Sequence, residues 1–269
     1  MRLRLLRVAE EGVHETVQTE WAKPTRIPHL PNGGLHLWRI DLAVEGSRRL
    51  IGEVERLLNS EERARAAQIR VLAAREEFIV GRGLLRRLIG HATSTDPGSL
   101  VFEPGPNGKP QLQGLAGIDF NVSHSRGLVL IAISRAGAVG VDVEFIDSGF
   151  AASGELLEMA RDSFYSEEFR KIECMATDRE RLLQFYRAWT RKEAVAKADG
   201  RGLALAVDYI SFPAEGLGES KVSLGGGESG QSLDYFVQTP DVGPNHLATV
   251  ATLRSGQPMS FFDAAALVG

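Results

Sequence analysis

Residues 118–146, IDFNVSHSRGLVLIAISRAGAVGVDVEFI, contain three apolar runs that are rich in β-branched residues. Two glycine-containing breaks separate the runs, one at Arg126 and Gly127 and one at Gly137. Short β-branched runs divided by such breaks are typical of consecutive antiparallel strands. This stretch therefore predicts three consecutive strands.

Helical and strand patterns surround this stretch on both sides. LHLWRIDLA (35–43) predicts an earlier strand, and residues 59–90 predict one or two helices that begin with an Asn-Ser-Glu-Glu capping sequence. Residues 154–197 again have helical spacing, and strand patterns follow as far as residue 254. Because strands and helices do not alternate regularly, the pattern favours an α+β fold with antiparallel sheets over a doubly wound parallel sheet.

The order strand, helix, strands occurs twice, in residues 35–135 and 139–254. We therefore predict two similar α+β halves joined near Ala138. The N-terminal half would comprise residues 1–138 and the C-terminal half residues 139–269.

The composition is that of an ordinary globular protein, with 43% hydrophobic and 25% charged residues. A formal net charge of −4 argues against a general nucleic-acid-binding surface. No window approaches the ~18 consecutive apolar residues needed to cross a bilayer. The single cysteine, Cys174, excludes a disulfide framework. We expect a soluble, cytoplasmic protein with no membrane and no nucleic-acid partner.

The VGVDVE run places Asp142 and Glu144 on one face of a predicted strand, because alternate residues of a strand share a face. Burying unpaired carboxylates is costly, so this pair either reaches solvent at a sheet edge or binds a cation. Oxygen ligands of this kind suit Mg²⁺, which combines one or two carboxylates with substrate phosphate oxygens. The residues alone leave both alternatives open.

Glu193 and Lys197 lie four residues apart in a predicted helix. They form either an ion pair on a solvated face or a third metal ligand beside an anion-binding cation. Ser123 and His124 end a predicted strand, where neighbouring side chains point to opposite faces. Ser123 therefore cannot use His124 as its base, which argues against a Ser-His-Asp hydrolase. A hydroxyl, an imidazole and a backbone N–H at a strand end can instead contact a phosphate.

Residues 60–90 contain seven arginines and four glutamates, a local positive excess in an acidic chain. This is either a solvated helix face or a platform for an anionic ligand. Lys109 stands in a Gly-Lys-Pro turn. The nucleotide motif GxxxxGK[ST] is absent from the sequence, and the glycine-containing run GRGLLRRLIG (81–90) lacks the GxGxxG spacing.

Four segments, in this order, resemble the Sfp-type 4'-phosphopantetheinyl transferases. They are Gly-Lys-Pro at 108–110, FNVSHS at 120–125, VGVDVE at 139–144 and WTRKEAVAK at 189–197. The resemblance implies a pseudo-twofold α+β fold with the active site at the interface of the halves. It also implies Mg²⁺-dependent transfer of the phosphopantetheine arm of coenzyme A to a serine of an apo acyl or peptidyl carrier protein, with release of 3',5'-ADP, by a monomer.

The resemblance assigns roles to individual residues. Three carboxylates match the metal ligands of the family: Asp142, Glu144 and Glu193. Glu193 is also the expected base for the serine proton, and Lys197 is expected beside the pyrophosphate. His124 and Ser123 match the pair that contacts phosphate. Three basic residues match positions that hold coenzyme A phosphates: Lys109, Arg65 and Arg63.

One segment departs from the family pattern. Members often carry an aromatic-Ser/Thr-x-x-Glu element, whereas here FYSEEF (164–169) places Glu168 only two residues after Ser166. We expect Ser166 to cap a helix and Glu168 to lie outside the site. We expect the apolar residues of this region to dock the carrier protein: Phe164, Tyr165, Phe169 and Ile172.

Two other functions use the same residues. A non-catalytic module that binds coenzyme A or a carrier protein would usually lack a site carboxylate or the lysine, and all of them are present here. A Mg²⁺-dependent phosphodiesterase would use water as the acceptor. The acidic composition and the Ser-His-Ser element speak against the phosphodiesterase.

Overall fold

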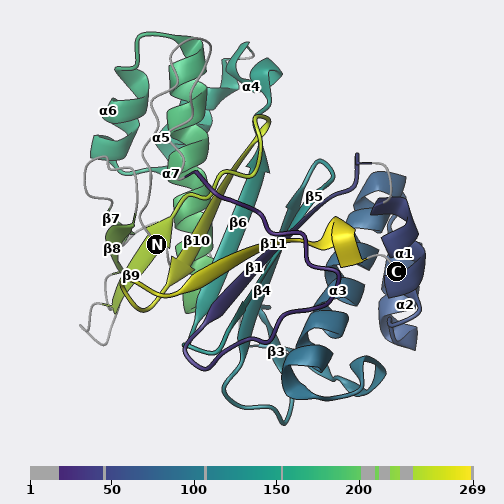
Figure 1. Ribbon diagram of the computed structural model, residues 1–269. Helices are drawn as coiled ribbons and strands as arrows, with labels where there is room; N and C mark the ends of the chain where they lie inside the picture. Colours follow the sequence, from purple (N-terminus) through teal and green to yellow (C-terminus); the bar gives the residue numbers. More distant parts are fainter. Residues whose placement is uncertain are drawn as a thin grey trace.

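The computed structural model describes residues 18–44, 47–105, 108–152, 154–200, 210–211, 219–224 and 233–267. These residues form layers in the order helices, sheet, sheet, helices (Figure 1). The α+β class predicted from the sequence is therefore confirmed. Within the described ranges, no helix is both long enough and apolar enough to cross a membrane.

The first sheet has the strand order β11 (Met259–Asp263), β1 (Leu35–Asp41), β5 (Leu128–Ser134), β4 (Asp119–Ser125). Three helices lie on the side away from the second sheet: α1 (Ser47–Glu55), α2 (Ser60–Gln68) and α3 (Leu72–Thr93). A 3-10 turn, η1 (Pro97–Ser99), and the hairpin of β2 (Phe102–Pro104) and β3 (Pro110–Leu112) connect α3 to β4. The capping sequence predicted at Asn59 is present, since Asn59 Oδ1 accepts from the Glu62 N–H at 2.8 Å.

The second sheet has the strand order β6 (Val139–Phe145), β10 (His246–Thr252), β9 (Leu233–Gln238), β8 (Ser220–Leu224), β7 (Ile210–Ser211). Helix α7 (Asp178–Asp199) packs along β6 and β10. Beside it lie α4 (Ser148–Ala152), α5 (Glu155–Ser163) and α6 (Ser166–Glu173).

Alternate residues of β1 serve two cores. Leu35 and Leu37 pack between the sheets with the valines of β6, whereas Trp38 and Ile40 pack with the helices of the first layer. This division follows from the two-residue period of a strand, which sends successive side chains to opposite faces. The sheet-to-sheet core holds β4 and β6 next to each other at one edge of the stack.

Gly140 determines how closely α7 approaches β6. A Cβ atom at this position would overlap the carbonyl oxygen of Ala194 and the amide of Ala198. The absent side chain therefore lets the helix backbone lie directly on the strand. As a result, Glu193 and Lys197 lie over the strand that carries Asp142 and Glu144.

The last described segment returns to the first sheet. β11 pairs parallel with β1, and the Phe262 ring lies 4.7 Å from that of Trp38, between ring centroids. The 3-10 turn η3 (Ala264–Leu267) follows in the same core. Phe262, Ala264 and Leu267 are therefore buried in the core of the first sheet and its helices, although they belong to the predicted C-terminal half of residues 139–269. The boundary near Ala138 remains a prediction.

Candidate active site between the two sheets

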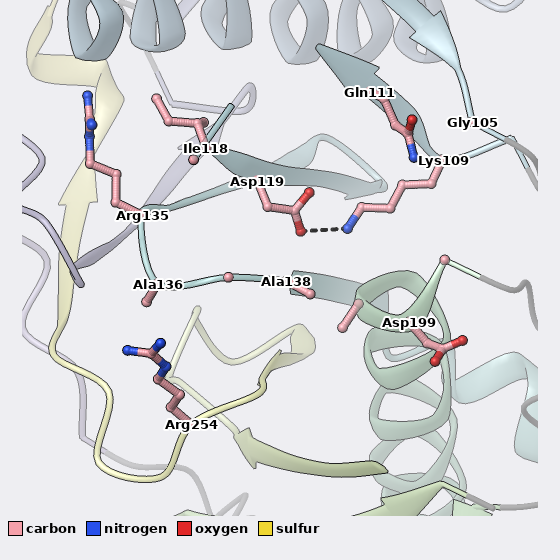
Figure 2. Close-up of a pocket in the computed structure, with 14 residues that line it drawn as sticks. Gly105, Lys109, Gln111, Ile118, Asp119, Arg135, Ala136, Ala138, Asp199 and Arg254 are labelled. Atoms are coloured by element: carbon pink, nitrogen blue, oxygen red, sulfur yellow. Dashed lines mark hydrogen bonds and ion pairs between the residues drawn. The ribbon is translucent and has the colours of Figure 1, made fainter. Parts of the chain in front are cut away.

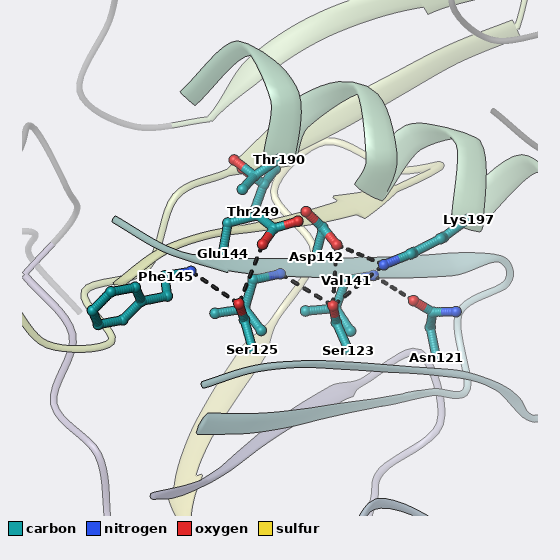
Figure 3. A network of polar contacts seen from close by, with 11 residues as sticks. Asn121, Ser123, Ser125, Val141, Asp142, Glu144, Phe145, Thr190, Lys197 and Thr249 are labelled. Carbon is teal, nitrogen blue, oxygen red and sulfur yellow. Dashed lines mark hydrogen bonds and ion pairs between the residues drawn. The ribbon is translucent and has the colours of Figure 1, made fainter. Parts of the chain in front are cut away.

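The edge strands β4 and β6 are joined by polar side chains at a contact that we call the seam. Every second residue of β4 accepts a hydrogen bond from a backbone N–H of β6. These four contacts, which we call rungs, are Asp119 Oδ2 with Val139 (2.7 Å), Asn121 Oδ1 with Val141 (2.9 Å), Ser123 Oγ with Val143 (3.2 Å) and Ser125 Oγ with Phe145 (3.1 Å). Figure 3 shows the last three.

Asp142, Lys197 and Ser123 form the centre of the seam (Figure 3). Lys197 Nζ lies 2.6 Å from Asp142 Oδ1, and Ser123 Oγ donates to the same oxygen at 3.0 Å. The Asp142 side chain is 4% exposed, and its Oδ2 has no hydrogen-bond partner in the part of the chain that the structure describes. A buried carboxylate oxygen without a partner is costly, so this atom marks a place for a cation or a ligand.

Two further carboxylates flank this centre. Glu144 accepts from Ser125 Oγ at 3.2 Å, and Glu193 lies on α7 one turn before Lys197. Burial raises the pKa of both carboxyls, and the negative charge of Asp142 raises the pKa of each further. Lys197 opposes both shifts. Three carboxylates therefore gather around Lys197 in this part of the seam.

The chemistry of these donors fits a magnesium ion, because carboxylate oxygens are its preferred protein ligands and Asp142 Oδ2 has an unused lone pair. Among the described residues, however, no three His, Cys, Asp or Glu side chains gather closely enough to hold a metal ion. Asp142 and Glu144 share the face of β6 that α7 covers, with Glu193 on that helix. The three-ligand magnesium site remains a prediction.

A pocket of about 260 Å³ lies between α3 and β4, and we call it the α3 pocket. Apolar side chains form much of its wall: Phe78, Leu85, Phe120 and Val122. Its polar lining residues are Arg65, Arg82, His124, Glu77 and one rung residue, Asn121. Apolar walls beside two guanidinium groups suit a ligand that joins a flat ring to an anionic group.

Ser123 and His124 point to opposite faces of β4. Ser123 faces the seam, whereas His124 Nδ1 lies 2.9 Å from Glu77 Oε2 on α3. The other oxygen of Glu77 accepts from the backbone N–H of Gly127 at 2.6 Å. The two neighbours therefore serve different places, Ser123 the seam and His124 the α3 pocket.

The structure does not bring the predicted basic residues together. Arg65 lines the α3 pocket with its guanidinium 5.2 Å from the centre of the Phe78 ring, and Arg63 is exposed on the same helix as Arg65. Lys109 instead lines a separate cleft of about 730 Å³ (Figure 2). Its Nζ lies 2.7 Å from Asp119 Oδ2, which ties the β2–β3 hairpin to the end of the seam.

The FYSEEF segment corrects one prediction. Tyr165, not Ser166, is the N-cap of α6, because the Glu168 carboxylate accepts from the Tyr165 N–H at 3.0 Å and Ser166 is already helical. Glu168 also lies 2.8 Å from the ammonium of Lys192, whose side chain is 2% exposed. Glu168 thus holds α6 against α7.

The apolar residues around this cap are not exposed as a group. Phe164 and Ile172 are buried in the core that α5, α6 and α7 share, whereas 39% of Tyr165 is exposed. A carrier-protein surface that includes all four predicted residues would therefore require two side chains that are buried in this core.

Arg82 is a site residue that the sequence reasoning missed. It lines the α3 pocket, and its buried Nη1 has no hydrogen-bond partner among the described residues, although Glu62 lies 3.5 Å from its Nε. Burial lowers the pKa of Arg82, and the neighbouring Arg86 and Arg65 lower it further. A signal was present in the sequence, because Arg82 follows Phe78 by four residues and therefore shares its helix face.

Comparison with known proteins covers most of the described chain. Residues 138–251 match the 4'-phosphopantetheinyl transferase superfamily, and residues 47–136 match the family described as 4'-phosphopantetheinyl transferase, N-terminal. The chain is 32% identical to the 4'-phosphopantetheinyl transferase HetI of Nostoc sp., over 67% of this chain and 76% of that protein. It is 26% identical to the 4'-phosphopantetheinyl transferase psf-1 of Bacillus pumilus, over 78% and 85% of the two chains.

Proposed function

The chain belongs to the 4'-phosphopantetheinyl transferase superfamily, and on that premise we propose that it transfers the 4'-phosphopantetheine group of coenzyme A to a serine of an apo acyl or peptidyl carrier protein. The serine oxygen forms a bond to the phosphorus that bears the pantetheine arm. The bond from that phosphorus to the leaving 3',5'-ADP breaks, and the serine proton passes to a base.

One observation carries this proposal: the seam pairs the buried Asp142 with the half-buried Lys197 and has two more carboxylates beside them, next to a pocket lined by Arg65, Arg82 and His124. A pyrophosphate needs positive charge on its oxygens, and its acceptor needs a base close by. The seam supplies both from residues of a single chain, which also supports action as a monomer.

Mg²⁺ is the expected cofactor, held by Asp142, Glu144 and Glu193. When bound, it would neutralise charge on the pyrophosphate and orient the transferred group for in-line attack. Asp142 Oδ2 is the atom with the clearest unused capacity for it. Side chains of the protein supply the base and the contacts to the phosphates.

Glu193 is the proposed base for the serine hydroxyl. Burial raises the pKa of its carboxyl, which brings the group closer to the pH at which it exchanges protons efficiently. Lys197 is half-buried and shares one oxygen of Asp142 with Ser123, so its ammonium can contact the leaving phosphate without leaving the seam. His124 and Arg65 hold the phosphate of the nucleotide end in the α3 pocket.

The test is to incubate the protein with Mg²⁺, coenzyme A and a set of apo carrier proteins, and to weigh the carriers by intact mass spectrometry. We expect one carrier to gain one phosphopantetheine, and the gain to disappear with EDTA and with Glu193→Gln. Glu173→Gln is the matched control, because it makes the same chemical change on an exposed part of α6 and should keep full activity.

Two results would contradict the proposal. Coenzyme A hydrolysis without carrier labelling would indicate a phosphodiesterase, and tight coenzyme A binding without labelling of any carrier would indicate a binding module.

We also propose a cytoplasmic location and a monomeric state. The exposed free cysteine, Cys174, is suited to the reducing cytoplasm. Gel filtration at several protein concentrations tests the monomeric state.

A further inference from the structure

We propose that Lys109 is a positioning residue for the α3 pocket. Its ammonium anchors the β2–β3 hairpin on the side away from the pocket, and the residues before and after it then form part of the pocket wall. This inference rests on the proposed function, which assigns the nucleotide end of coenzyme A to the α3 pocket. It gives Lys109 a role that involves no contact with a phosphate.

Residues 108–111 alternate between two cavities. Gly108 and Pro110 line the α3 pocket, whereas Lys109 and Gln111 line the separate cleft. This alternation is expected of an extended chain, in which successive side chains point to opposite faces. Figure 2 shows the Lys109 side chain in the separate cleft, directed at Asp119. Lys109 therefore projects away from the α3 pocket while both of its neighbours border it.

The Lys109 ammonium is held by two fixed acceptors. Its Nζ lies 2.7 Å from Asp119 Oδ2 and donates to the carbonyl oxygen of Val139 at 3.1 Å. The same Asp119 oxygen accepts from the Val139 N–H at 2.7 Å, so the hairpin, β4 and β6 meet at this point. Because 13% of the Lys109 side chain is exposed, the ammonium has little surface left for a ligand.

The hairpin depends on contacts of this kind, because β2 and β3 pair with each other and with no other strand that the structure describes. A two-stranded hairpin alone is marginally stable in water. At the base of the hairpin, the Phe102 ring packs against Phe120 with the ring centroids 5.3 Å apart, and Leu112 packs against the first core. At residues 108–110, the contacts of Lys109 join the hairpin to β4 and β6.

The experiment removes each partner of the ion pair and keeps the backbone contact of Asp119. Lys109→Met retains a long side chain without its charge. Asp119→Asn can still accept from the Val139 N–H, as Asn121 accepts from the Val141 N–H at 2.9 Å. Binding of 3',5'-ADP is measured by titration calorimetry for the wild type, both single variants and the double variant. The melting temperature of each protein is measured alongside.

We expect each single variant to bind 3',5'-ADP about three- to tenfold more weakly, because the affinity falls with the fraction of molecules whose hairpin is in place. The double variant should bind no more weakly than either single variant, since all three lose the same anchor. A direct contact between Lys109 and a phosphate predicts a different pattern. Lys109→Met would then weaken binding, whereas Asp119→Asn, which removes a negative charge, would not.

Adenosine separates the same two roles, because it has the flat ring and carries no phosphate. An anchored pocket wall predicts that Lys109→Met weakens adenosine binding by the same factor as 3',5'-ADP binding, measured by ligand-observed NMR. Arg254→Met is the matched control, since it removes a cation from an exposed position in the same cleft. It should leave the binding of both ligands unchanged.

Four results would overturn the inference. They are unchanged 3',5'-ADP binding by Lys109→Met, opposite effects of the two single variants, unchanged adenosine binding by Lys109→Met, and an equal loss of affinity in Arg254→Met. If Lys109→Met does not fold, Asp119→Asn makes the same test, and its unchanged binding would overturn the inference. Failure of the proposed function is recognised separately, because the wild type would then label no carrier. A wild type that labels a carrier while Lys109→Met binds normally removes only this inference.

Discussion

Helices α3 and α7 occupy corresponding places on the two sheets, yet they use their inward-facing cations differently. Arg86 of α3 is fully buried and donates to Glu62 at 2.7 Å and to two backbone carbonyl oxygens at 2.8 and 2.9 Å. The side chain of Lys197 of α7 remains 30% exposed and shares its partner Asp142 with a serine. A cation enclosed by fixed acceptors belongs to the fold, whereas one at a half-open seam remains available to a ligand.

The largest expected effect is a loss of folding free energy when Arg86 of α3 is replaced. Arg86→Met leaves the buried Glu62 without its closest cation and two carbonyl oxygens without a donor. Removing one partner of a buried ion pair typically costs about 3–5 kcal/mol of folding free energy. Denaturant unfolding should show this loss, while the remaining folded protein keeps its activity. A stable variant with lost activity would contradict the structural role of Arg86.

On α7 we expect the reverse result, a loss of activity without a loss of stability. Glu193→Gln should lower kcat/KM at least about a hundredfold, since it removes the proposed base. The pKa of Glu193 is higher in the folded chain than in the unfolded one, so its ionisation opposes folding above that pKa. The variant should therefore melt at or above the wild-type temperature at pH 7, and the two should converge below about pH 4. A large drop in melting temperature at pH 7 would refute this.

Two glycine substitutions sharpen the comparison of how each helix meets its sheet. Gly140→Ala forces a methyl into the backbone of α7 and should cost about 1–3 kcal/mol of stability or more. Gly81→Ala on α3 brings its Cβ only to 3.3 Å from a methyl of Val122, and the helix gains propensity in return. Thermal unfolding should show a clear loss for the first and little change for the second. Equal losses would mean that the two contacts are alike.

The smallest expected effect is on the affinity for coenzyme A, when Arg82 of α3 is replaced at the α3 pocket. Arg82→Gln removes a guanidinium whose Nη1 is buried without a partner among the described residues. We expect coenzyme A to bind about tenfold more weakly, in line with loss of one charge-assisted hydrogen bond. Calorimetric titration measures this, with Arg49→Gln on the exposed face of α1 as the control. Equal affinity in the Arg82 variant would exclude a direct contact.

Local patterns predicted much of the fold. The cap at Asn59 and the three strands of residues 118–146 follow from chemistry within a few residues, and the structure contains both. The return of β11 to β1 could not be predicted, because the apolar pattern of residues 259–263 marks a strand without naming its partner. Tyr165 was missed as a cap because its N–H is satisfied by Glu168, whereas the sequence offered a serine beside it.

The site shows the same division between local and long-range information. Strand alternation is enough to place Asp142 and Glu144 on one face. The placement of Lys109 depends on where the β2–β3 hairpin folds. Its ammonium pairs with Asp119, and Lys109 therefore lines a different cleft from Arg65. The rungs were not predicted, because polar residues at every second position of 119–125 mark one face of a strand without identifying the backbone N–H groups that they accept from.

The rungs also affect how the protein behaves at high concentration. β4 and β6 are edge strands of their sheets, and edge strands present unpaired backbone groups on which strands of other molecules can assemble. The four side chains of β4 occupy the N–H groups of β6 that would otherwise be open. Opening the seam would expose both edges at once. The polar contacts that organise the site therefore also guard the molecule against aggregation.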